Sequence, residues 1–86
     1  MTASERLADL GYEDVIILAD YGYDDALIGV TEDNRAVYDF DKMVDWLHDK
    51  HGFEYDEAVE WIEYNTIRAL PYAGAGAPII LHRLPE

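Results

Sequence analysis

The hydrophobic and polar positions near the N-terminus predict a helix followed by a strand. Thr2 and Glu5 have the spacing of a capping box, which indicates a short helix from about Ala3 to Leu10. Gly11 is placed to end that helix. The next apolar stretch, "DVIILAD" at residues 14–20, is continuous rather than alternating and has the length of a strand. We therefore expect a well-covered strand there.

The middle of the chain predicts a β-hairpin and then a helix. The segments "ALIGVT" (26–31) and "RAVYDF" (35–40) flank the short polar loop "EDN". From residue 39 the apolar period changes from two to 3.6, so a helix is predicted. An aspartate at position 39 or 41 can cap its start, and Gly52 can end it.

A second amphipathic helix and a last strand complete the pattern. The helix begins near Tyr55 and cannot continue through Pro71, because proline lacks the backbone N–H that a helix interior needs. The segment "PIILHR" (78–83) has the composition of a final strand. Residues 1–86 thus predict one α+β domain. We expect a short N-terminal helix, a three- to four-stranded and mainly antiparallel sheet, two consecutive helices packed on it and a C-terminal strand.

The net charge of the chain excludes some classes of binding partner. The chain has 19 acidic and 6 basic residues, a net charge of −13, whereas small domains usually carry about 2 to 8. Such an excess opposes binding to phosphate backbones or anionic membranes. We expect a basic protein as partner, with no direct contact to nucleic acid or membrane. The absence of cysteine, and of any apolar run of about 20 residues, favours a cytoplasmic protein.

The acidic residues recur at helical spacing. One set lies on the first predicted helix of the pair and one on the second: Asp41, Asp45 and Asp49, then Asp56, Glu60 and Glu63. Two parallel ridges of this kind would carry one charge per roughly 3 Å, about half the charge density of duplex DNA. The set is thus a candidate binding surface for a basic groove. Two alternatives stay open, a solvated outer face and adaptation to a high-salt host.

Other candidate chemistry is sparse. Tyr64, Arg68 and Tyr72 either fix the turn before the last strand or form a recognition loop, since exposed tyrosine is a preferred contact residue. His48 and His51 have a spacing that can support a metal ion when further ligands converge, but equally suit a helix C-terminus. No nucleophile arrangement or phosphate-binding loop is present. We expect no enzyme activity, no cofactor and no dedicated metal site.

Three stretches of the sequence resemble a known group of proteins: "DDALIGVTEDNRAVYDFDKMV", "EAVEWIEYNTIRALPY" and "APIIL". The group consists of small proteins of unassigned function that are carried by phages and integrative elements of bacteria. The run "YNTIRALPY" is the most distinctive part. The resemblance implies a mobile-element accessory protein and carries over no catalytic residue. In that setting, compact acidic proteins often block host defence nucleases by occupying their nucleic-acid grooves.

The sequence therefore leads to two functional hypotheses. The first is a non-enzymatic acidic binding module, a DNA-mimic inhibitor of a host nucleic-acid-binding or defence protein of the anti-CRISPR or anti-restriction type. The second is a structural or oligomerising accessory protein, with a homodimer as the candidate assembly, in which the charge serves only solubility or salt tolerance.

Overall fold

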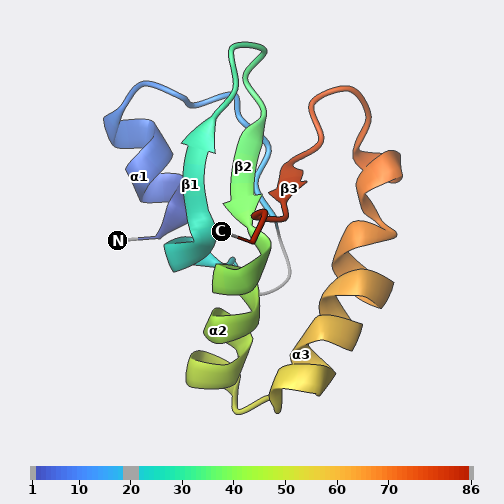
Figure 1. Cartoon of the computed structure of the whole chain (residues 1–86). Coiled ribbons are helices and arrows are strands. Elements are labelled where there is room, and N and C mark those ends of the chain that lie inside the picture. The colour runs from blue at the N-terminus through green and yellow to red at the C-terminus, as the bar shows by residue number, and fades with distance from the viewer. Residues whose placement is uncertain (1, 19–21, 86) are drawn as a thin grey trace.

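The computed structural model describes residues 2–18 and 22–85 and has the predicted α+β class (Figure 1). The helices and strands are α1 (Ala3–Asp9), β1 (Leu27–Val30), β2 (Ala36–Asp39), α2 (Phe40–His51), α3 (Tyr55–Trp61) and β3 (Ile79–Leu81). Three short helical turns complete the order: 3₁₀ turns at Asp24–Ala26 and Leu70–Ala73, and a π-helical turn at Ile62–Ile67 that follows α3 directly.

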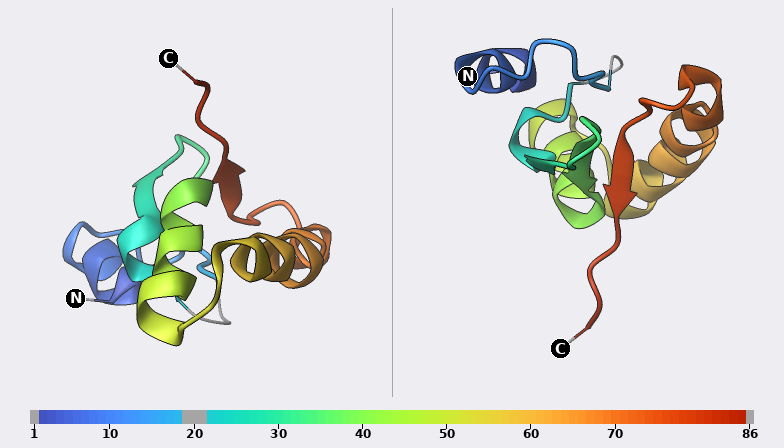
Figure 2. Two further views of the ribbon diagram at one scale, coloured as in Figure 1. Left: turned by 60° about the horizontal axis from the view of Figure 1, so that its bottom comes forward. Right: turned by 90° about the horizontal axis from the view of Figure 1, so that it is seen from above.

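The three strands form one mixed sheet in the order β1-β2-β3. β1 and β2 are antiparallel, which confirms the predicted hairpin, with an irregular register between Leu27 and Gly29. β3 lies parallel to β2, with Val37 beside Ile79. The prediction of a mainly antiparallel sheet is therefore only partly correct. The reason is visible in Figures 1 and 2: α2 and α3 form a helical hairpin that returns the chain to the start of β2 before β3 begins.

The strand predicted at 14–20 is wrong for residues 14–18, which belong to none of the strands. Residues 19 and 20 lie outside the described residues. The apolar side chains of this segment still cover the core, where Leu18 is buried. The amide of Leu18 donates at 3.3 Å to the side-chain hydroxyl of Tyr38 in β2, which is not a backbone hydrogen bond of a sheet. Burial raises the pKa of Tyr38 above its ordinary value, while this hydrogen bond opposes the rise.

The core lies between the sheet and the helices. Its largest fully buried side chains come from the segment before β1, the sheet, α2 and the helical segment after α3: Tyr23, Tyr38, Met43, Leu47 and Ile62. The buried face of α3 continues through the π-helical turn as Ala58, Ile62 and Thr66. The hydroxyl oxygens of Thr66 and Tyr23 lie 3.5 Å apart and join this face to the segment before β1.

The predicted ends of α1 and α2 are confirmed. Thr2 and Glu5 form the capping box, and their hydrogen bonds lower the pKa of Glu5. Gly52 ends α2 with a φ of 73°, a conformation that glycine adopts without strain. α1 is fixed to the turn before β1 because the Asp24 carboxylate accepts from the amide of Ala3 at 2.7 Å.

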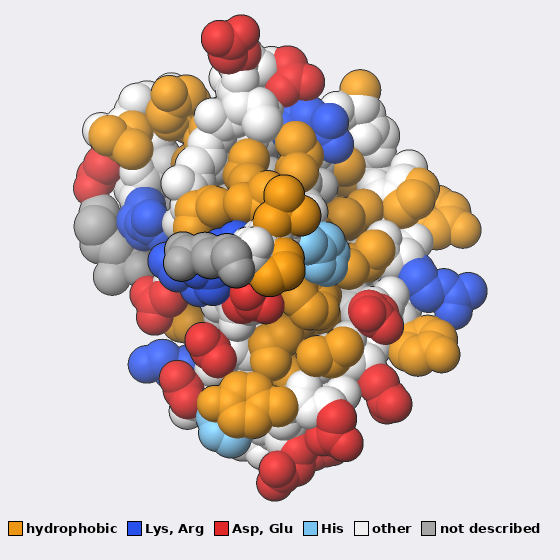
Figure 3. Space-filling view, in the orientation of Figure 1, with side chains coloured by type: hydrophobic (Ala, Val, Ile, Leu, Met, Phe, Trp, Pro, Cys, Tyr) orange, Lys and Arg blue, Asp and Glu red, His pale blue; other side chains and the backbone are white. Residues whose placement is uncertain are grey.

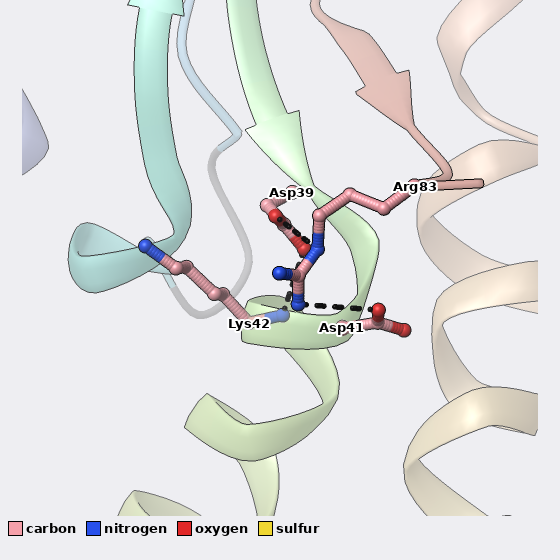
Figure 4. Close-up of polar contacts among 4 residues, drawn as sticks. All are labelled: Asp39, Asp41, Lys42 and Arg83. Atoms are coloured by element: carbon pink, nitrogen blue, oxygen red, sulfur yellow. Dashed lines mark hydrogen bonds and ion pairs between the residues drawn. The ribbon is translucent and has the colours of Figure 1, made fainter. Parts of the chain in front are cut away.

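Asp39 joins β2, α2 and the C-terminal segment (Figure 4). One of its carboxylate oxygens accepts from the amide of Lys42 at 3.2 Å and so caps α2. The other lies 3.0 Å from Nε of Arg83, two residues after β3, and the Asp39 side chain is only 4% exposed. Arg83 also places Nη2 3.3 Å from a carboxylate oxygen of Asp41. A single buried carboxylate therefore fixes the start of a helix and the end of the chain.

We expect Asp39→Asn to lower the free energy of unfolding by about 1–2 kcal/mol, because asparagine still caps α2 but cannot form the ion pair. Asp39→Ala should cost about 1 kcal/mol more, since the cap is lost as well. Urea unfolding followed by circular dichroism measures both differences. Asp41→Asn is the control, since its ion pair is exposed and should contribute under ~1 kcal/mol. Equal effects at positions 39 and 41 would contradict the role of Asp39.

Candidate functional site

The six acids of the candidate surface are all exposed: Asp41, Asp45, Asp49, Asp56, Glu60 and Glu63. The first three lie on α2, the next two on α3, and Glu63 lies in the π-helical turn. The two helices are not parallel ridges, however. In Figure 1, α2 and α3 are closest at the 52–54 link and diverge from there. The charge density expected for parallel ridges therefore applies only near the link.

Hydrophobic side chains separate the acidic groups. Figure 3 shows the acidic side chains over α2 and α3 with hydrophobic side chains between them. At the link end, the Tyr55 ring stacks on the His48 ring with a centroid distance of 4.1 Å. Tyr55 is nevertheless 54% exposed. The surface thus combines carboxylates with accessible aromatic area and is not a uniform acidic plate.

The two helices differ in how much basic charge accompanies the acids. On the α2 side, Asp41 is paired with Arg83. The next two acids of α2 share a hollow of about 270 Å³ with two lysines, and its lining residues are Asp25, Lys42, Asp45, Trp46, Asp49 and Lys50. The segment 55–67, in contrast, contains no lysine or arginine. The strongest uncompensated negative charge therefore lies along α3 and the turn after it.

The Tyr64, Arg68 and Tyr72 group is also exposed, and both tyrosines are accessible, at 63% and 92%. The guanidinium carbon of Arg68 lies 5.8 Å from the centroid of the Tyr64 ring, within the range of a cation–π contact. No ion pair joins Arg68 to a carboxylate within residues 2–18 and 22–85. The carbonyl of Trp61, the last residue of α3, accepts a hydrogen bond from the side-chain amide of Asn65 at 3.2 Å. Recognition by this group stays a prediction.

His48 has a structural role in the link between the helices. Its Nδ1 lies 2.8 Å from the carbonyl oxygen of Phe53, which requires Nδ1 to carry the proton and donate. Within the described ranges 2–18 and 22–85, no group of three or more His, Asp or Glu side chains is placed to hold a metal ion. Over the same ranges, no helix has the length and apolar character to cross a bilayer.

The sequence did not predict the surface hollows of the described residues, and two of them are relevant to binding. One is a groove of about 270 Å³ between α1 and β1, lined mainly by apolar side chains that include Leu10 and Ile28. The other is a shallow cleft of about 280 Å³ beside α3, where Phe53 of the link meets Trp61 and Tyr64. Only the i, i+3, i+4 and i+7 spacing of Glu57, Glu60, Trp61 and Tyr64 could have indicated the second one.

No family model, curated protein or solved structure matches this chain.

The acidity of α3 should cost stability. The side chain of Glu60 has acidic residues three or four positions away on both sides, at 56, 57 and 63, and like charges at that spacing repel. We expect Glu60→Gln to raise the free energy of unfolding by about 0.3–1 kcal/mol at low salt, and the gain to vanish near ~1 M salt. Urea unfolding at both salt concentrations measures this. A loss of stability at low salt would contradict the repulsion.

Proposed function

We propose that the protein is a non-enzymatic binding module whose acidic helical surface engages a basic protein, as a DNA-mimic inhibitor of a host nucleic-acid-binding or defence protein. The observation that carries this proposal is the α3 segment, where exposed carboxylates have no basic residue beside them in the sequence. These carboxylates repel one another, and no basic residue of the segment offsets the repulsion. A positively charged partner would relieve it. The sequence resemblance to mobile-element proteins supports a role against a host protein, because accessory proteins of this kind often act on host defence nucleases.

The mechanism requires no chemistry. Carboxylates along α2 and α3 would lie against the lysines and arginines with which the partner holds nucleic acid, and so exclude the nucleic acid from the groove. Charge of this kind steers association and makes it fast at low salt. The exposed tyrosines beside the carboxylates, Tyr55 and Tyr64, add contact area that salt does not screen.

Charge reversal tests the surface. The variant Asp45→Lys, Asp49→Lys and Glu63→Lys changes three exposed acids that make no ion pair within the described part of the chain. We expect it to lose at least ~10-fold in affinity for the partner, because attraction becomes repulsion. The matched control reverses three exposed acids away from the surface, Asp9, Glu13 and Glu32. Both variants carry the same net charge.

The measurement is retention of bacterial nucleic-acid-binding proteins on the immobilised chain. Retained proteins should be displaced by duplex DNA and by raised salt, since both compete for the same basic groove. Any protein that meets these criteria is then purified, and its affinity for both variants is measured. Equal affinity of the surface variant and the control variant rules this surface out, and retention that DNA does not displace rules out mimicry.

A second candidate function is homodimerisation, and the groove between α1 and β1 favours it. β1 is an edge strand of the sheet, and Leu10, at 75% exposure, is accessible beside it. Exposed apolar groups next to a strand edge are a common basis for self-association. In that case the acidic surface would only maintain solubility.

Sedimentation separates the two candidates. A dimer formed through the groove should persist at low and high salt and should dissociate to monomer in the variant Leu10→Lys, Ile28→Lys. Asp45→Lys, Asp49→Lys, Glu63→Lys is the control, because it leaves the groove unchanged. A monomer in the unsubstituted chain at ~100 μM under both conditions excludes this second function.

A further inference from the structure

The cleft beside α3 combines aromatic walls with carboxylates. Phe53 and Trp61 meet edge to face, with ring centroids 6.0 Å apart and planes at 73°. Tyr64 forms the third aromatic side, and Glu57 and Glu60 complete the lining with Asn65. The residues come from adjacent turns of one helical face plus the link that precedes α3, so the framework that positions them is the helical hairpin itself.

This combination is the chemistry that recognises an organic cation. The face of an aromatic ring carries negative charge density that attracts ammonium and guanidinium groups, most strongly for tryptophan. Two carboxylates beside such rings add direct charge pairing. Glu57 keeps one oxygen engaged with the amide of Glu54 at 3.1 Å. The side chain of Glu60 makes no hydrogen bond or ion pair within residues 2–18 and 22–85, which leaves its carboxylate available to a ligand.

The same chain contains a filled site of similar composition. On α2, Nζ of Lys50 lies 5.8 Å from the centroid of the Trp46 ring, in the hollow that Asp45 and Asp49 also line. A tryptophan next to carboxylates thus receives a basic side chain from within the protein on α2. The segment 55–67 contains no lysine or arginine. The next basic residue along the chain, Arg68, lies 5.8 Å from the centroid of the Tyr64 ring and is not among the residues that line the cleft.

We propose that the cleft of Phe53, Glu57, Glu60, Trp61 and Tyr64 binds one arginine side chain of the basic partner. Arginine suits it better than lysine, because the planar guanidinium can stack on one ring while its edge donates to a carboxylate. The two ring planes lie at 73° to each other, so their faces, which carry the negative charge density that attracts a cation, are turned in different directions. The inference deepens the proposed function and rests on it, since the arginine belongs to the partner that the acidic surface attracts.

A monomeric probe tests the cleft separately from the acidic surface. N-acetyl-arginine methylamide is titrated into the ¹⁵N-labelled full chain, and the two tryptophan indole N–H signals are followed by NMR, with Trp46→Phe used to assign them. We expect a saturable shift of the Trp61 signal with a Kd on the order of 10 mM, and little change of Trp46. N-acetyl-glutamine methylamide, which has no charge, should shift neither signal.

Matched variants locate the binding. Tyr64→Ala and Glu60→Gln should each weaken arginine binding by about two- to five-fold, the factor expected for an exposed cation–π or charge contact. Tyr72→Ala and Glu63→Gln change an exposed tyrosine and an exposed glutamate that both lie outside the cleft lining. Both variants should bind arginine as the unsubstituted chain does. Tyr64→Phe keeps the ring and should retain most of the affinity.

Three results would overturn the inference. One is a Trp61 signal that does not move or moves without saturating, and another is equal weakening in the cleft variants and their controls. The third is equal binding of N-acetyl-lysine methylamide, which contradicts the assignment to arginine. None of these results affects the retention of basic proteins, which is tested at Asp45, Asp49 and Glu63. Failure of the cleft and failure of the acidic surface are therefore distinguishable.

Discussion

The arrangement of this protein depends on the buried carboxylate of Asp39. A two-stranded hairpin is marginal by itself, so the sheet needs β3, which has three residues and reaches β2 only after two helices. Arg83 holds the segment after β3 against Asp39 at the point where β2 ends and α2 begins. Because a buried charge is costly without a partner, this pair ties the start of α2 to the segment after β3.

The fold therefore separates its charges by role. Two acids near the strands make contacts within the fold: Asp24 accepts from the amide at the start of α1, and Asp39 pairs with Arg83. Acids on the outer sides of α2 and α3 are exposed, and the α3 segment has no basic residue of its own. Their mutual repulsion is small per pair, a few tenths of a kcal/mol, and the core opposite them offsets it. The fold can therefore maintain this acidic surface without a partner, and basic groups of a partner would reduce the repulsion between its carboxylates.

Local chemistry was predictable from the sequence and long-range placement was not. The capping box at Thr2 and the end of α2 at Gly52 depend on residues within one helical turn, and both predictions are confirmed. A cap of α2 was predicted at position 39 or 41, and the structure places it at Asp39. The apolar run at 14–18 reads as a strand, yet its Leu18 amide bonds to Tyr38. The parallel position of β3, the divergence of α2 and α3, and the contact of Phe53 with Trp61 arise only from tertiary packing. Exposure of the six acids followed from periodicity, but their separation by hydrophobic side chains did not.

The tyrosines provide the argument against a surface that serves solubility alone. A face shaped only by solvation gains nothing from exposed aromatic rings, which favour aggregation. Here Tyr55 and Tyr64 are both more than half exposed beside the acids of α3, and Tyr72 is almost fully exposed one short turn further on. Charge is screened over about 8 Å at physiological salt, whereas the burial of tyrosine against a partner is not. A partner held by both would bind fast through the carboxylates and dissociate slowly because of the rings, and high salt would slow association far more than it speeds release.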